Sequence, residues 1–188
     1  MLKGFAIVGL AVVALVTSDS GKSNAQQPKL EMHRVGVSAD DGSGWHLAVS
    51  TKGSFAIRTP IPFNDFTTHD PSTGAMSHVV GAKSSEGIKF AASESPVTSK
   101  TPADLGAIPK SFSSNPTNKV SDLSRSTKDG ADVLSFSVSN ATSTAHFKYI
   151  RTGTTLYLLS IEAPVAHRDL ASAAKEQFFG SFKLKSKP

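Results

Sequence analysis

The sequence LYLLSIEA, residues 156–163, decides the fold. Side chains alternate between the two faces of a strand. Both faces are apolar here, with Tyr157, Leu159 and Ile161 on one and Leu156 and Leu158 on the other. A strand of this kind is typically central in a sheet and covered on both sides. The stretch therefore predicts a layered protein built around this strand.

Shorter alternating patterns on both sides of that stretch predict its neighbours. Two hairpins are expected before it, followed by a meander, and a closing strand is expected after it. The expected strands are 45–49, 55–59, 76–82, 88–93, 120–126, 134–138, 145–149 and 181–185. In the first of them, Trp45, Leu47 and Val49 form the apolar face. We expect an antiparallel sheet of about seven or eight strands.

Two helices are expected to pack on this sheet. Helical spacing over 169–180 places an apolar face on one side and polar residues in water on the other. The expected apolar face consists of Leu170, Ala173, Ala174, Gln177 and Phe178. A shorter helix should begin at Pro102, with Thr101 as its cap, and end or kink at Pro109, because proline disrupts a helix interior. The fold class is thus α+β, an antiparallel sheet with helices packed on it.

The N-terminus has the three parts of a secretory signal, a basic start, a short apolar run and a polar exit. The apolar run, residues 5–16, is shorter than the roughly 20 residues that span a bilayer as a helix. Ser23-Asn24-Ala25 offers small side chains at a cleavage site, so we expect a signal peptide over 1–25 and a mature start at Gln26. A cut after Ser18 is the alternative. With either cleavage site, we expect the mature protein to be periplasmic or secreted.

For the rest of the chain, the sequence predicts a flexible lead-in over 26–44 and one α+β domain over 45–188. The segment 40–44 is rich in aspartate, serine and glycine, which favours turns rather than a packed core. About 160 residues suit one domain with a single core.

Composition excludes several partners and sites. The chain has no cysteine, which excludes disulfides and a cysteine-linked lipid anchor. Its net charge is +5, and it is +4 once Lys3, Asp19 and Lys22 are removed with the signal peptide. A small, scattered charge favours solubility and indicates no nucleic-acid site. We expect no membrane span, no lipid anchor and no nucleic-acid partner.

Signals of chemistry are weak. Ser172-Ala173-Ala174-Lys175 has the S-x-x-K spacing of a lysine-assisted serine, and Arg151-Thr152-Gly153 imitates K-T-G. Their order along the chain is the reverse of the order in penicillin-recognising enzymes, so Ser172 and Lys175 are expected to be solvated helix residues. The six histidines show no metal-ligand spacing. We assign no catalytic, metal-binding or cofactor-binding residue from the sequence.

One segment is a candidate partner-binding site. Pro60 and Pro62 lack backbone donors and stiffen the chain, and Ile61, Phe63 and Phe66 make this segment apolar. We expect an irregular segment that runs to about Gly74. Its three apolar side chains either present a binding surface at low entropic cost or fold across the sheet edge and seal the core.

Two stretches of the C-terminal third form a recognisable pattern, namely residues 149–159, YIRTGTTLYLL, and residues 178–184, FFGSFKL, at the end of the last helix. This pattern resembles the close of domains in the PsbP-like superfamily. Residues 53–60, GSFAIRTP, look like the first hairpin of that family. The resemblance implies an α/β/α sandwich around an antiparallel sheet, and non-enzymatic, protein-binding work. The lipidated cysteine of its DcrB-like members is missing here.

Two functional interpretations remain. The first is an exported, soluble, non-catalytic protein-binding domain of the bacterial envelope, whose partner is another envelope protein. The alternative is a small periplasmic or secreted hydrolase whose site is assembled from distant segments. A serine within hydrogen-bond reach of a histidine that a carboxylate orients would favour the hydrolase, because a serine nucleophile needs an oriented base.

Overall fold

The computed structural model describes residues 29–71, 74–99 and 101–185. Within these ranges the strands form an eight-stranded sheet and a three-stranded sheet, here called the large and the small sheet. Neighbouring strands of both sheets are antiparallel. The large sheet runs in the order β1 (Lys29–Val37), β4 (Phe63–His69), β5 (Met76–Lys83), β6 (Lys89–Pro96), β10 (Thr155–Pro164), β9 (Ser143–Thr152), β8 (Ala131–Ser139) and β7 (Lys119–Lys128).

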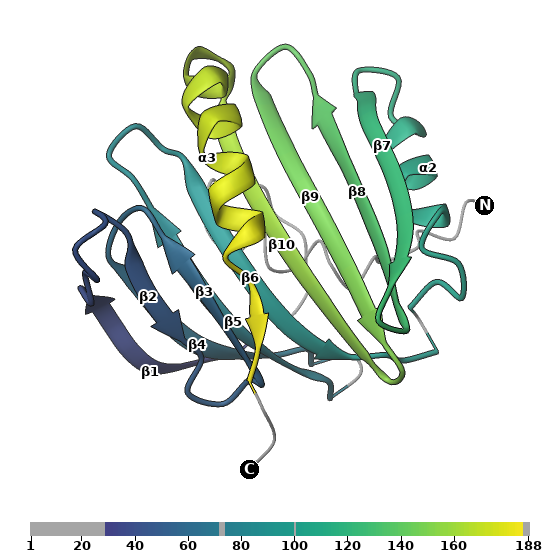
Figure 1. Ribbon diagram of the computed structural model, residues 1–188. Coiled ribbons are helices and arrows are strands. Elements are labelled where there is room, and N and C mark those ends of the chain that lie inside the picture. The colour runs from purple at the N-terminus through teal and green to yellow at the C-terminus, as the bar shows by residue number, and fades with distance from the viewer. Residues whose placement is uncertain (1–28, 72–73, 100, 186–188) are drawn as a thin grey trace.

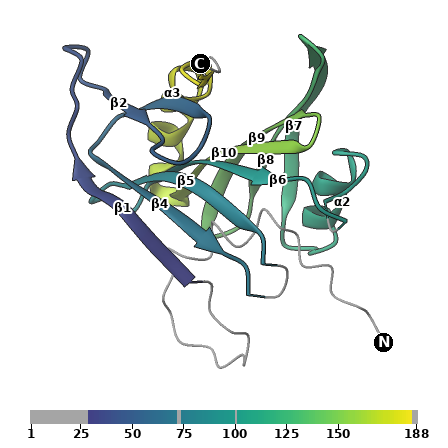
Figure 2. The ribbon, with the colours of Figure 1, turned by 90° about the horizontal axis from the view of Figure 1, so that it is seen from below.

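Different elements cover the two faces of the large sheet (Figures 1 and 2). On one face, called the α3 face, lie helix α3 (Arg168–Gly180) and the small sheet, whose order is β11 (Lys183–Leu184), β3 (Phe55–Thr59) and β2 (His46–Val49). A single 3-10 turn, η1 (Val165–His167), leads into α3. On the other face the short helix α2 (Ala107–Ser113) packs near β7, β8 and β9.

Strand β10 is the centre of the large sheet, as its two apolar faces predict. Tyr157, Leu159 and Ile161 are buried in the core beneath α3 and the small sheet, where Phe178 and Phe90 meet edge to face at 5.4 Å. The opposite face of β10 contributes Leu156 and Leu158 to a second core beneath α2. One strand therefore holds both cores together, each excluding apolar area from water.

The architecture confirms a large antiparallel sheet but departs in part from prediction, because β2 and β3, which were expected in that sheet, lie in the small sheet, and the molecule is not a plain α/β/α sandwich. The molecule is mostly sheet, and a small sheet shares with α3 the layer that the sequence assigned to helices alone. Both predicted hairpins, the meander and the C-terminal helix are present. The closing strand β11 pairs with β3 of the small sheet rather than with the large sheet.

Two strands lie where the sequence predicted irregular chain. Strand β1 falls within the expected lead-in over 26–44, and β4 falls within the expected irregular segment after Pro62. Neither strand shows a clear apolar alternation in its sequence. Polar contacts between side chains help to hold β1 against β4 instead. Buried Asp65 Oδ2 accepts hydrogen bonds from Arg34 Nη2 at 2.8 Å and from the Thr51 amide at 2.8 Å. The buried Asp65 carboxylate needs such partners to offset its lost hydration, and the partly exposed Arg34 guanidinium supplies the opposite charge.

The buried faces of two elements also differ from prediction. In β2 the buried side chains include Ala48, whereas Leu47 and Val49 are exposed. In α3 the buried residues are Ala171 and Phe178, and Leu170 is 57% exposed. Alanine is favoured at both contacts because its small side chain lets an overlying layer approach the large sheet closely.

Helix α2 accommodates the proline that was expected to end or kink it. The helix begins at Ala107 rather than at the predicted Pro102, so Pro109 lies in its first turn. Backbone N–H groups in the first turn have no partner within the helix, so a proline there removes no helical hydrogen bond. In the described ranges no helix is long and apolar enough to cross a membrane.

Candidate functional site

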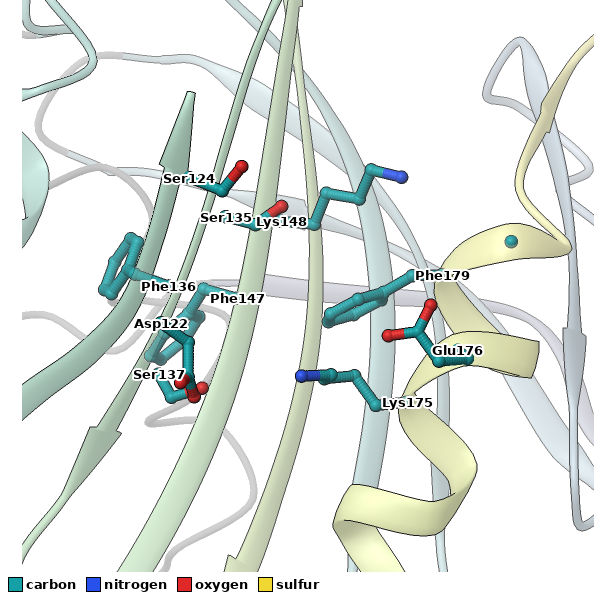
Figure 3. A pocket seen from close by; sticks show the side chains of 11 residues that line it. Asp122, Ser124, Ser135, Phe136, Ser137, Phe147, Lys148, Lys175, Glu176 and Phe179 are labelled. Carbon is teal, nitrogen blue, oxygen red and sulfur yellow. The ribbon is translucent and has the colours of Figure 1, made fainter. Parts of the chain in front are cut away.

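A groove of about 300 Å³ lies on the α3 face, between α3 and the strands β7, β8 and β9 (Figure 3). It is called the α3 groove below. Serines, charged residues of both signs and three phenylalanines line it. The lining residues are Asp122, Ser124, Ser135, Phe136, Ser137, Phe147, Lys148, Lys175, Glu176, Phe179 and Gly180.

Strand register places the serines. Ser135 pairs with Ser124 of β7 and with Lys148 of β9, and Ser137 pairs with His146. Paired residues of neighbouring strands project from the same face. Alternate residues of β8, such as Phe136, point into the core beneath α2. The polar half of an alternating strand therefore forms the floor of the groove.

Asp122 reaches the groove from an irregular position in β7. The register between β7 and β8 shifts between Ser121 and Ser124, which marks a β-bulge, and Asp122 has a φ of 55°. Left-handed backbone is unfavourable for residues other than glycine, although aspartate and asparagine tolerate it best. Bulges re-aim a side chain and are frequent beside functional sites. The bulge in β7 places the Asp122 carboxylate on the strand side of the groove, across from α3 (Figure 3).

A buried histidine lies beside the groove and links the sheet to α3. His146 Nδ1 is 2.8 Å from Ser137 Oγ, and His146 Nε2 is 3.3 Å from Ser172 Oγ. Burial lowers the pKa of His146, and the positive charge of Lys175 lowers it further, against the opposing influence of Asp122. His146 is therefore neutral near pH 7, with one ring nitrogen donating and the other accepting.

This arrangement is not a catalytic triad. In a triad, a carboxylate bonded to Nδ1 orients the histidine and stabilises the imidazolium that forms. Here a serine hydroxyl, that of Ser137, occupies the Nδ1 position. Within the described residues, no carboxylate is hydrogen-bonded to His146 and no group of His, Asp or Glu side chains could hold a metal ion.

The charged groups of the groove have no ion-pair partner in the described part of the chain, although Asp122 Oδ2 accepts a long hydrogen bond of 3.5 Å from Ser121 Oγ. Among the described residues, Asp122, Lys148, Lys175 and Glu176 form no ion pair within 4 Å. Burial lowers the pKa of Lys148, and the nearby Glu176 carboxylate opposes that change. These four groups are available to a ligand.

The expectation of two solvated helix residues at Ser172 and Lys175 needs correction. Ser172 is exposed, but its hydroxyl contacts His146. Lys175 is half-buried and lines the α3 groove. The two residues are one turn apart on α3 and face the strands that the sequence could not place beside it.

The sequence-predicted partner residues lie elsewhere and do not form one surface. Phe63 is 1% exposed in the core beneath the small sheet, with the Arg34 guanidinium carbon 5.3 Å from its ring centre. Ile61 is partly buried against the same core. Phe66 points to the opposite face of β4, because residues three apart on a strand project in opposite directions, and it borders a smaller cavity of about 110 Å³.

A further cavity of about 260 Å³ lies near the end of the large sheet where β6 and β10 meet. His78 and Glu94, which are paired across β5 and β6, contribute to its lining. Burial lowers the pKa of His78, against the opposing charge of Glu94. Glu94 accepts a hydrogen bond from the Ser54 amide at 2.5 Å, and His78 Nδ1 lies 3.0 Å from Thr67 Oγ1. Both groups are thus engaged in holding the small sheet and β4 to β5 and β6.

Comparison with known proteins gives a likeness of fold. No family model matches the chain, and no curated protein matches it. Among solved structures, the chain is similar to the solution structure of cyanobacterial PsbP (CyanoP) from Synechocystis sp. PCC 6803, with 11% sequence identity and a TM-score of 0.45. The match covers 79% of this chain and 98% of that chain.

Proposed function

We propose that this protein is an exported, non-catalytic binding domain of the bacterial envelope that holds a segment of another envelope protein in the α3 groove. The destination is periplasmic or secreted, after cleavage behind Ala25. That cleavage site lies outside the described residues, so the proposal of export rests on the signal-like pattern of the N-terminus.

One observation carries the binding proposal: the α3 groove presents two serine hydroxyls without hydrogen-bond partners and four charged groups without ion pairs among the described residues. Among the described residues, the hydroxyls of Ser124 and Ser135 have no hydrogen-bond partner, and the four charged groups have no ion pair. Polypeptide backbone supplies donors and acceptors in alternation, which matches hydroxyls that can both donate and accept. Phe179 adds an apolar surface at the same place (Figure 3).

A small hydrolase is the second candidate. It is favoured by the contact between exposed Ser172 and His146, at 3.3 Å from Oγ to Nε2. A hydrogen bond of this length is long for an activated nucleophile, although such bonds can tighten when substrate binds. Ser137 in place of a carboxylate at Nδ1 leaves the imidazolium without a charged stabiliser. We therefore rank binding first.

The test blocks the groove without disturbing the cores. Ser135→Trp places a large ring on the groove floor, and Ser85→Trp, in the exposed turn between β5 and β6, is the matched control. Each tagged variant is expressed in the native envelope, cross-linked and captured, and its thermal melt is recorded. We expect the same captured envelope protein with the native chain and Ser85→Trp, and its loss with Ser135→Trp at an unchanged melting temperature. Equal capture by both variants would contradict binding in the groove.

A further inference from the structure

The signs of the four groove charges follow a pattern. Asp122 comes from β7 and Lys148 from β9, while Lys175 and Glu176 come from α3 and extend toward the strands (Figure 3). Each wall of the groove therefore carries one acidic and one basic group. The groove has no net formal charge, yet each of its charges lacks an ion-pair partner in the described part of the chain.

The backbone of β7 fixes the position of one of the four charges, that of Asp122. Asp122 reaches the groove through the β-bulge and the left-handed φ of 55° described above. A regular strand would bring no such extra residue to this position. A conformation that is costly for a non-glycine residue persists where the surrounding structure holds it, and such conformations cluster at ligand sites.

Partial burial affects a second of the four charges, that of Lys148. Lys148 is half-buried, and burial disfavours its charged form. An incoming carboxylate would restore part of the stabilisation that the ammonium group lost with its water. The acidic groups Asp122 and Glu176 would in turn repel such a carboxylate, so it must be accompanied by a positive charge.

We propose that the segment held in the α3 groove is polyampholytic: it presents a basic side chain to Asp122 and Glu176 and an acidic side chain to Lys148 and Lys175. The proposal rests on the proposed function and names the chemistry of its ligand. Backbone amides of the segment bond to Ser124 and Ser135, whose hydroxyls are free of partners in the described part of the chain. A purely acidic or purely basic segment meets two repulsive groups for every two attractive ones, so the groove selects against it.

The experiment uses four capped tripeptides as probes, namely Lys-Ser-Glu, Lys-Ser-Lys, Glu-Ser-Glu and Ser-Ser-Ser. Each is titrated to millimolar concentration into the ¹⁵N-labelled protein at low and at physiological salt. We expect the mixed-charge peptide to shift the amide signals of Ser124, Ser135 and Gly180. Its affinity should exceed that of each other peptide by about two- to fivefold, the range expected for an exposed ion pair, and the margin should shrink with salt.

Charge variants make the test specific. Lys148→Glu should move the preference toward the peptide with two lysines, and Asp122→Asn should reduce the advantage of the mixed peptide. Lys110→Gln, an exposed substitution on α2 at the opposite face, is the control and should change nothing. Equal affinities for the four peptides, shifts located elsewhere, or a preference that Lys148→Glu leaves unchanged would each overturn the proposal. If capture of the envelope partner still depends on Ser135 in that case, the proposed function stands and only the polyampholyte is rejected.

Discussion

Replacing Phe63 with alanine distinguishes the two roles that the segment 60–66 was given. Phe63 is 1% exposed and belongs to the core beneath the small sheet, and the Arg34 guanidinium lies over its ring. A buried Phe→Ala substitution loses the transfer free energy of the ring and leaves a cavity, at a cost of about 3 to 5 kcal/mol. For a domain of this size, that corresponds to a fall in melting temperature of roughly 6 to 20 °C.

Phe66 provides the internal comparison. Its ring is only partly buried, on the other face of β4. Less area is lost when it is truncated, so Phe66→Ala should cost about half as much, roughly 1.5 to 2.5 kcal/mol. Both variants are measured by calorimetry and by urea unfolding, together with capture of the envelope partner.

The expected order is a large loss of stability for Phe63→Ala, a smaller loss for Phe66→Ala, and capture that is retained by the fraction still folded. A Phe63→Ala variant that melts like the native protein but loses its partner would refute this reasoning. It would show that Ile61, Phe63 and Phe66 act as a partner surface.

Three further predictions follow from the N-terminus, from α3 and from the buried histidine. Exported protein should begin at Gln26 by intact-mass measurement, and a mass that retains residues 1–25 would reject the cleavage site. Ser172→Ala should lower the free energy of unfolding by about 0.5 to 1.5 kcal/mol, because it removes the hydroxyl that contacts buried His146, and a fluorophosphonate should not label Ser172 in the native protein. The folded-state pKa of His146 is below its usual value of 6.5, so the unfolded chain takes up a proton first as the pH falls. The stabilising contribution of neutral His146 is therefore complete above about pH 6.5 and is lost as the pH falls from there toward the folded-state pKa; His146→Gln should flatten the measured dependence of stability on pH in that window, and an unchanged slope would contradict the assignment.

Local sequence determined the elements that bury an apolar face. Strand β10, the hairpin of β5 and β6 and the extent of α3 were predictable because periodic apolar residues report burial over a few neighbouring positions. The absence of cysteine also determined that the fold stands without disulfides. These features depend on residues that are close in the chain.

Tertiary structure decided the rest. Strands β1 and β4 are held by polar contacts such as Arg34 with Asp65, whose residues are 31 positions apart, and such pairs leave no periodic pattern. The groove unites β7, β8, β9 and α3, and His146 meets Ser172 only because α3 packs over β9. The serines of β8 opposite its apolar residues were a visible signal of a polar face, but not of what lies across from it. Periodicity tells which side of an element leaves water, whereas the partners of the polar side depend on how distant elements pack.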